Sequence, residues 1–115
     1  MQQKYQIVSG TGTANNATPT VALIAAQGAG KVIRITAYII TVTTAATGGS
    51  GIVSFKDGTT TLMSWDANAL MNSQVNLGEG IGYPISANSA FNLVAENAGG
   101  NQATVNGSCV GYVVQ

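Results

Sequence analysis

Histidine is absent from this sequence, and cysteine occurs only once, as Cys109. Without histidine the chain lacks the most frequent general base and the most frequent metal ligand of proteins. A single cysteine excludes both an internal disulfide and a thiolate zinc cluster. Residues 107–111 read as a buried strand, where a free thiol behaves as a small apolar side chain. We therefore expect Cys109 to be an inert core residue.

Charged side chains are also scarce. They make up 7% of the residues, against about 25% in an average globular protein. The four basic residues balance the four acidic ones. No run of lysine or arginine is present to neutralise phosphate groups, so the sequence predicts no nucleic-acid binding. Because soluble monomers normally rely on surface charge to stay dispersed, the composition predicts a subunit that covers much of its surface by association.

The four acidic residues, Asp57, Asp66, Glu79 and Glu96, are spread along the chain. Glycoside hydrolysis would need two of them close together across a cleft. Calcium binding by Asp57, Asp66 and Asn68 would need oxygen ligands at shorter spacing. Together with the missing histidine, this pattern predicts a protein that is not an enzyme and has no catalytic residues, no cofactor and no metal site.

The strongest strand signal is the run of residues 31–43, which is rich in β-branched side chains and contains no glycine, proline, aspartate or asparagine. Such residues pack well on a pleated sheet and lose rotamer freedom in a helix. Because alternate side chains of a strand point to opposite faces, Ile33, Ile35 and Ile39 are expected to share a core face. The opposite face begins with Arg34 and is expected to be partly covered. This run is predicted to be the central strand.

The rest of the sequence reads as short strands separated by turns. Asp57 and Gly58, between residues 52–56 and 59–65, predict a hairpin with a two-residue turn. One helical turn is expected over residues 66–72. Further strands are predicted at residues 5–8, 18–25, 74–77, 90–96 and 102–115. About eight strands at this spacing predict an all-β chain folded as an antiparallel β-sandwich or a barrel.

Residues 1–17 are predicted to be an N-terminal strand that continues as an extended arm, because residues 9–16 are small or polar and show no apolar period. Residues 18–115 are predicted to form one sandwich domain. The arm is expected to lie along a neighbouring subunit or to add a strand to it. Tyr5 and Ile7 are its candidate contact residues.

Four further residues are candidates for contacts with other molecules. Lys31 and Arg34 could pair with acidic residues of a neighbouring subunit, although ordinary solvated charge explains them equally well. Trp65 and Tyr83 could form an exposed aromatic platform for a sugar ring. In the alternative interpretation, Trp65 ends a strand inside the core.

Four segments, in this order, resemble a known group of proteins. They are residues 30–35 (GKVIRI), 51–58 (GIVSFKDG), 90–93 (AFNL) and 106–112 (NGSCVGY). From Gly30 to Tyr112 the pattern is similar to the small β-sandwich proteins found in the structural gene clusters of tailed phages. The resemblance implies a jelly-roll-like fold without catalytic residues. It also implies a virion component, either a capsid decoration (cement) protein or a short fibre or tail-tip subunit, usually a trimer.

The leading hypothesis is a non-enzymatic virion structural protein that forms a homotrimer on the outer capsid surface and bridges neighbouring major capsid proteins. The alternative is a fibre or tail-tip module that recognises carbohydrate on the host. The first residues lack the apolar segment of a signal peptide, and Arg34 interrupts the longest apolar run. We therefore expect synthesis in the host cytoplasm, without a signal peptide and without a membrane span.

Overall fold

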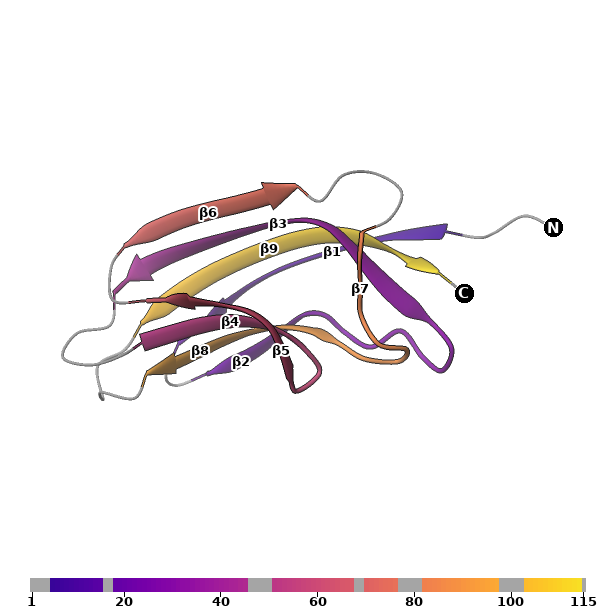
Figure 1. The fold of residues 1–115 in the computed structure, drawn as a ribbon, viewed down its shortest axis with the longest axis horizontal. Coiled ribbons are helices and arrows are strands. Elements are labelled where there is room, and N and C mark those ends of the chain that lie inside the picture. Colours follow the sequence, from indigo (N-terminus) through magenta and orange to yellow (C-terminus); the bar gives the residue numbers. More distant parts are fainter. Residues whose placement is uncertain are drawn as a thin grey trace.

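The computed structural model describes residues 5–15, 18–45, 51–67, 70–76, 82–97 and 103–114. Every regular element in these ranges is a β-strand (Figure 1), which confirms the predicted all-β class. The strands are β1 (Tyr5–Ala14), β2 (Thr20–Ile24), β3 (Val32–Thr44), β4 (Gly51–Asp57), β5 (Thr60–Asp66), β6 (Met71–Asn76), β7 (Tyr83–Pro84), β8 (Phe91–Asn97) and β9 (Thr104–Val114).

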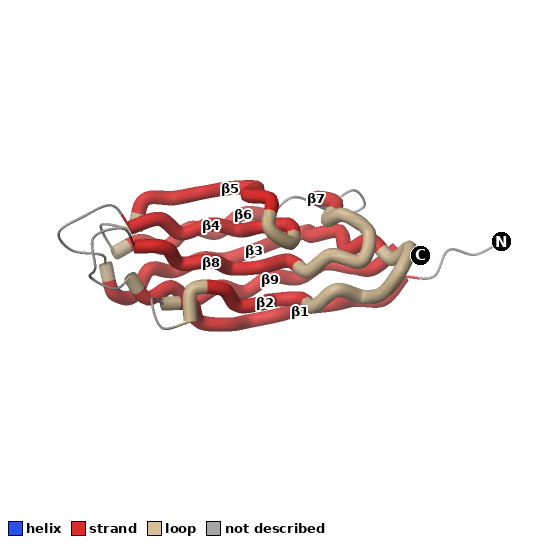
Figure 2. The backbone as a smooth tube through the Cα atoms, turned by 90° about the horizontal axis from the view of Figure 1, so that it is seen from below, coloured by secondary structure: helices blue, strands red, loops and turns tan. Residues whose placement is uncertain are grey.

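The strands form two antiparallel sheets that pack face to face (Figure 1). The first sheet has the order β1-β9-β3-β6, with the short β7 paired to β3. The second sheet has the order β2-β8-β4-β5, which Figure 2 shows from below. In these orders β1 lies beside β9, β2 beside β8, β3 beside β6 and β4 beside β5, as in a double ribbon folded over on itself. This is the strand arrangement of a jelly roll, so the predicted sandwich of about eight strands is confirmed.

The central strand β3 changes its inward-facing side part way along. Ile33 and Ile35 are buried in the core, but the next buried side chains are Tyr38 and Ile40. The pairing with β9 shifts between Ile35 and Ala37, because one extra residue is inserted on β3 there. The prediction that Ile39 shares the core face of Ile33 is therefore wrong: Ile39 points outward and is 44% exposed.

The core between the sheets contains a group of aromatic rings. Phe55 on β4 stacks on Phe91 of β8 with ring centroids 4.9 Å apart. Tyr38 on β3 meets Phe55 edge-on at 4.8 Å, so this contact joins the two sheets. Aromatic pairs of these geometries add about 0.5–1.5 kcal/mol beyond their buried area. The rings therefore help to fix one sheet against the other.

Along one side of the sandwich, β1 lies against β2. A Cβ atom at Gly10 would collide with the backbone carbonyl group of Leu23, so only glycine permits this approach. The loop or arm predicted from residue 9 onward needs correction: residues up to Ala14 belong to β1, which pairs with β9 along its whole length. The small residues of this segment serve close packing and do not make it an arm.

The β4–β5 hairpin is confirmed, but its turn is one residue later than predicted. Its two turn residues are Gly58 and Thr59, and Gly58 takes a φ of 59°. Asp57 remains in β4 and pairs with Thr60. Its side chain is therefore free to contact another loop.

The helical turn predicted over residues 66–72 is wrong for the residues that the structure describes. Asp66 ends β5, and Met71 and Asn72 belong to β6, which pairs with β3. A helix this short has little stability of its own. The backbone edge of β3 offers this segment hydrogen-bond partners along one side instead.

Candidate interaction surface

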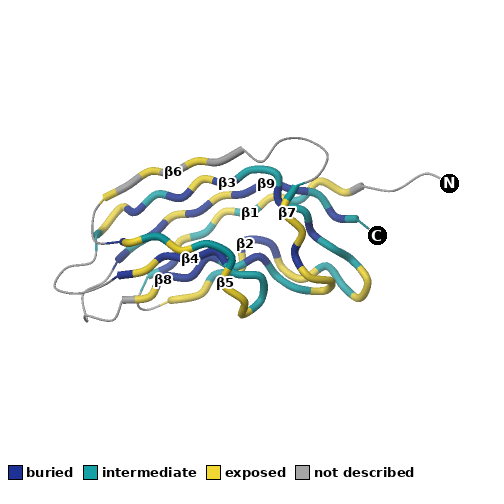
Figure 3. Tube along the Cα trace, in the orientation of Figure 1, coloured by how far each residue is buried: buried dark blue, intermediate teal, exposed yellow. Residues whose placement is uncertain are grey.

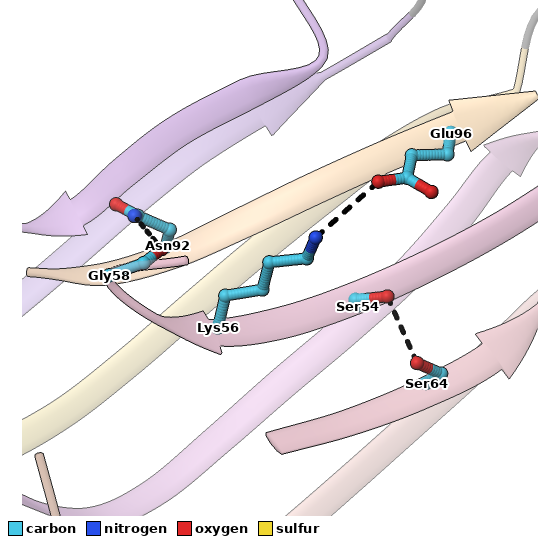
Figure 4. Close-up of polar contacts among 6 residues, drawn as sticks. All are labelled: Ser54, Lys56, Gly58, Ser64, Asn92 and Glu96. Carbon is cyan, nitrogen blue, oxygen red and sulfur yellow. Dashed lines mark hydrogen bonds and ion pairs between the residues drawn. The ribbon is translucent and has the colours of Figure 1, made fainter. Parts of the chain in front are cut away.

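The two sheets have outer faces of different chemistry. On the outer face of the second sheet, Lys56 of β4 forms an ion pair with Glu96 of β8 at 3.4 Å (Figure 4). Asp66 of β5 is exposed on the same face, because it lies opposite Ile52 in the β4–β5 pairing. We call the surface around Lys56, Asp66 and Glu96 the charged face.

The outer face of the first sheet is almost free of charge. Among its described residues only Arg34 is charged, and it lies towards one end, opposite Tyr112 of β9. Buried and outward-facing residues alternate along β9 and along β3 on either side of the extra residue (Figure 3). We call the following outward residues the neutral face: Ile7, Ser9, Thr11 and Thr13 of β1, Asn106, Ser108 and Val110 of β9, Ala37, Ile39 and Thr41 of β3, and Asn72 and Gln74 of β6.

Hydroxyl groups on this side of the first sheet donate hydrogen bonds within the chain. Thr13 Oγ1 donates to Asn106 Oδ1 at 2.6 Å, and Ser108 Oγ donates to Thr11 Oγ1 at 3.0 Å. Thr36, the extra residue of β3, donates to the carbonyl oxygen of Val110 at 3.1 Å. A donor that already has a partner loses little when water is removed from it. Covering these three hydroxyl groups therefore carries a small polar penalty.

A shallow apolar hollow of about 120 Å³ lies in the neutral face between β3 and β9. It is lined by residues 37–39 and 108–110. Ile39 and Val110, beside it, are 44% and 38% exposed. Neither was among the predicted contact residues. The sequence of β3 has apolar residues at both odd and even positions. Which of the two sets faces outward depends on the inserted residue, and the sequence alone does not reveal it.

The two predicted basic contact residues, Lys31 and Arg34, lie in different elements of the structure. Arg34 is half-buried at the end of the outer face of the first sheet. Lys31 lies in the turn before β3, where its backbone N–H donates to the carbonyl oxygen of Gly28 at 3.1 Å. Its own carbonyl oxygen accepts from the backbone N–H of Asn88 at 3.0 Å. The backbone of Lys31 thus has a structural role in this turn.

The two aromatic residues predicted as a sugar platform lie on strands of different sheets. Trp65 on β5 is half-buried and meets Tyr38 and Phe55 edge-on, with ring centroids 5.9 and 5.5 Å apart. This position agrees with the alternative interpretation, in which Trp65 ends a strand inside the core. Tyr83 on β7 pairs with Ile35 of β3 and is 43% exposed. A second hollow, of about 330 Å³, is lined by Gly51, Ile52, Ser64, Trp65 and Asp66.

The two contact residues predicted in the N-terminal arm lie on β1. Tyr5 pairs with Val114 and Ile7 with Tyr112 of β9. Ile7 is 74% exposed and lies on the neutral face. The side chain of Tyr5 lies outside the described part of the structure. Ile7 is therefore accessible for contacts, but from a strand that is integral to the sandwich.

The hydrogen bonds of Asp57 join β4 to the segment between β7 and β8. Asp57 Oδ2 accepts hydrogen bonds from the backbone N–H and the hydroxyl of Ser86, at 2.9 and 2.7 Å. Burial raises the pKa of Asp57, but the hydrogen bonds from Ser86 and Ser89 outweigh it, so the pKa lies below its ordinary value. On the charged face, Ser54 and Ser64 are hydrogen-bonded at 3.0 Å (Figure 4). Glu79 lies outside the described residues.

Cys109 is buried in the core side of β9, at 7% exposure. Burial raises the pKa of its thiol to about 11. A thiol with such a pKa is almost entirely protonated at neutral pH, and the protonated form is a poor nucleophile. This environment agrees with the inert core role expected from the sequence.

Within the described ranges, no three metal-binding side chains of histidine, cysteine, aspartate or glutamate come together. No helix in that part of the chain is long and apolar enough to cross a bilayer. No protein-family model matches the sequence. No curated protein matches it with significant similarity.

Proposed function

We propose that this chain is a non-enzymatic structural protein of a virion, a capsid decoration protein that self-associates and bridges neighbouring major capsid proteins. The observation that carries the proposal is the contrast between the neutral face and the charged face. A jelly roll whose one outer face, among its described residues, carries no charge apart from Arg34 is suited to contact with other protein subunits. The segments that resemble phage β-sandwich proteins support the same role, and they imply a trimer.

The proposed mechanism follows from mass action. A ligand that binds the assembled capsid in preference to its free subunits stabilises the assembly. A decoration protein with several copies joined together engages several coat subunits at once. Once one copy is bound, the other copies are held at a high effective concentration near their own binding sites. Weak individual contacts then give tight binding of the whole assembly. No bond-making chemistry is needed for this function.

The direct test is binding to particles of the virus that encodes the chain. Purified protein added to capsids that lack it should co-sediment with them and raise the temperature at which they disassemble. Electron microscopy of the decorated particles should show added density on the outer surface. Capsids that gain neither bound protein nor thermal stability would contradict the proposal.

A second candidate function is carbohydrate recognition by a fibre or tail-tip module. The hollow beside Trp65 favours it, since Ser64 and Asp66 supply polar groups next to an apolar wall. A glycan array tests this candidate, and Asp66→Asn should weaken any sugar binding without removing the core contacts of Trp65. Binding that survives both Asp66→Asn and Ser64→Ala would exclude this hollow as the sugar site.

A further inference from the structure

Asp57 and Gly58, where β4 enters the hairpin turn, are the one place in the sequence where glycine follows aspartate. Such a pair is chemically sensitive, because glycine has no side chain to hinder attack by its backbone nitrogen on the neighbouring carboxyl group. We propose that Asp57–Gly58 is a latent isomerisation site, which the segment 85–92 keeps unreactive while the chain is folded. The product of the reaction is isoaspartate at position 57.

The reaction needs no partner except water. The backbone nitrogen of Gly58 attacks Cγ of Asp57 and loses its proton, so that an N–Cγ bond forms, a Cγ–O bond breaks and water leaves. Water then adds to the cyclic imide. Opening of the new N–Cγ bond restores aspartate. Opening of the original bond between the carbonyl carbon of Asp57 and the nitrogen gives isoaspartate, in which the main chain is longer because it runs through Cγ.

The attacking nitrogen is held away from Cγ in the folded chain. The backbone N–H of Gly58 donates to the carbonyl oxygen of Ala90 at 2.9 Å. The carbonyl oxygen of Gly58 accepts from Asn92 Nδ2, also at 2.9 Å (Figure 4). Asp57 itself pairs with Phe91 in the β4–β8 ladder. To reach Cγ, the peptide group between Asp57 and Gly58 must rotate, which would break the hydrogen bond to Ala90.

The carboxyl group of Asp57 is held by the same segment. Its Oδ2 accepts two hydrogen bonds from Ser86, at 2.9 and 2.7 Å, and its Oδ1 is buried. Burial raises the pKa of Asp57, but the hydrogen bonds from Ser86 and Ser89 outweigh it and keep the pKa below its ordinary value. A carboxylate is a poorer target for attack than the protonated carboxyl group, from which water can leave. Both reacting groups are therefore restrained by residues 85–92.

Asn106–Gly107 gives an internal reference for this reaction. It is the one place where glycine follows asparagine, and it reacts through the same imide with loss of ammonia. The pair lies within β9, between β1 and β3, so it becomes reactive only when that sheet opens. Asp57–Gly58 lies at the end of a strand, where a smaller and local opening suffices. A change that loosens only residues 85–92 should accelerate the reaction at Asp57 alone.

Ser86→Ala tests the proposal. It removes one hydrogen bond to the carboxylate of Asp57 and should raise the rate of isomerisation there about tenfold, as expected for the loss of a hydrogen bond to a charged group. Ser86→Thr keeps the hydroxyl group and should react at the wild-type rate. Ser64→Ala is the matched control, because it removes the hydrogen bond between Ser54 and Ser64 in the same hairpin. It should leave the rate at Asp57 unchanged.

A protease that cleaves before aspartate but not before isoaspartate provides the measurement. Each protein is incubated in warm neutral buffer, then unfolded and digested. The loss of cleavage before Asp57, relative to cleavage before Asp66, gives the isomerised fraction. The mass of the fragment that contains Asn106 reports deamidation in the same sample. Circular dichroism confirms that each variant is folded, and wild-type chain kept in urea gives the rate without the fold.

The folded wild-type protein should isomerise at Asp57 at least about tenfold more slowly than the chain in urea. Equal rates in buffer and in urea would overturn the inference. So would an unchanged rate in Ser86→Ala, an equal rise in Ser64→Ala, or an equal acceleration at Asn106, which would indicate general unfolding. If Ser86→Ala does not fold, Asn92→Ala replaces it, because it removes the donor to Gly58. This protection belongs to the folded chain, whether or not the protein binds capsids.

Discussion

Asp57 shows how one side chain can hold two loops together. It ends β4 just before the hairpin turn, and its carboxylate accepts two hydrogen bonds from Ser86, in the segment between β7 and β8. The sequence assigned Asp57 to the turn itself, because an Asp-Gly pair is the usual hairpin signal. The displacement by one residue could not be predicted, since it depends on a partner 29 positions away in the chain.

The lowered pKa of Asp57 predicts a loss of stability in acid. A group whose pKa is lower in the folded state contributes stability above its unfolded pKa, about 3.9, and this is lost as the pH falls through the folded value. Asp57→Asn should reduce the unfolding free energy at pH 7 by about 1 kcal/mol and make the remaining stability less sensitive to acid. Urea unfolding at neutral and at acidic pH measures both effects.

Ser86→Ala removes the hydroxyl that donates to Asp57 and should likewise reduce the acid sensitivity. If both variants lose as much stability in acid as the wild-type protein, the hydrogen bonds of Asp57 are not the cause.

At the scale of strands, the sequence predicted what depends on local pattern. Residues 31–43 and 90–96 were predicted as strands close to their observed bounds, because β-branched and alternating residues signal extended chain. The wrong predictions concern segments whose structure is determined by pairing or packing with a neighbouring strand. The segment that contains Met71 forms β6 on the free edge of β3, and the glycine-rich end of β1 is held between β9 and β2. The outward direction of Ile39 required knowledge of the extra residue in β3.

The contact of β1 with β2 predicts a strong dependence on one glycine. Gly10→Ala should lower the unfolding free energy by about 3 kcal/mol or more, because its Cβ would meet the rigid backbone of Leu23. Gly12→Ala is the matched control on the same side of β1. Its Cβ would meet the side chain of Val21 at 2.6 Å, which can shift. Chemical denaturation of both should show the smaller loss for Gly12→Ala, and equal losses would contradict the close-packing argument.

At the scale of the whole molecule, the separation of charge between the two outer faces is the main property. The composition predicted that few charges would be available, but not where they would lie. Lys56, Asp66 and Glu96 come from three different strands and meet on one side only because the jelly roll places β4, β5 and β8 side by side. Apart from Arg34, the described residues of the opposite outer face are therefore uncharged.

Self-association through the neutral face should respond weakly to salt. Contacts between uncharged surfaces are not screened by ions, whereas exposed ion pairs are. We expect the Kd to change by less than about threefold between roughly 0.05 and 0.5 M NaCl, as measured by sedimentation equilibrium. A weakening of about tenfold or more over this range would show that charged groups carry the association.

The inserted residue at Thr36 has a further consequence for how this protein can change over generations. Before it, odd-numbered positions of β3 look into the core, and after it even-numbered positions do. Deleting Thr36 would leave Ala37 opposite Val110 and Ile40 opposite Gly107, the pairs that they already form, so the later side chains of the strand would keep their directions. Descendants of this chain can therefore lose this one residue and keep the pattern of β3, whereas the loss of one residue further along the strand would turn side chains to the opposite face.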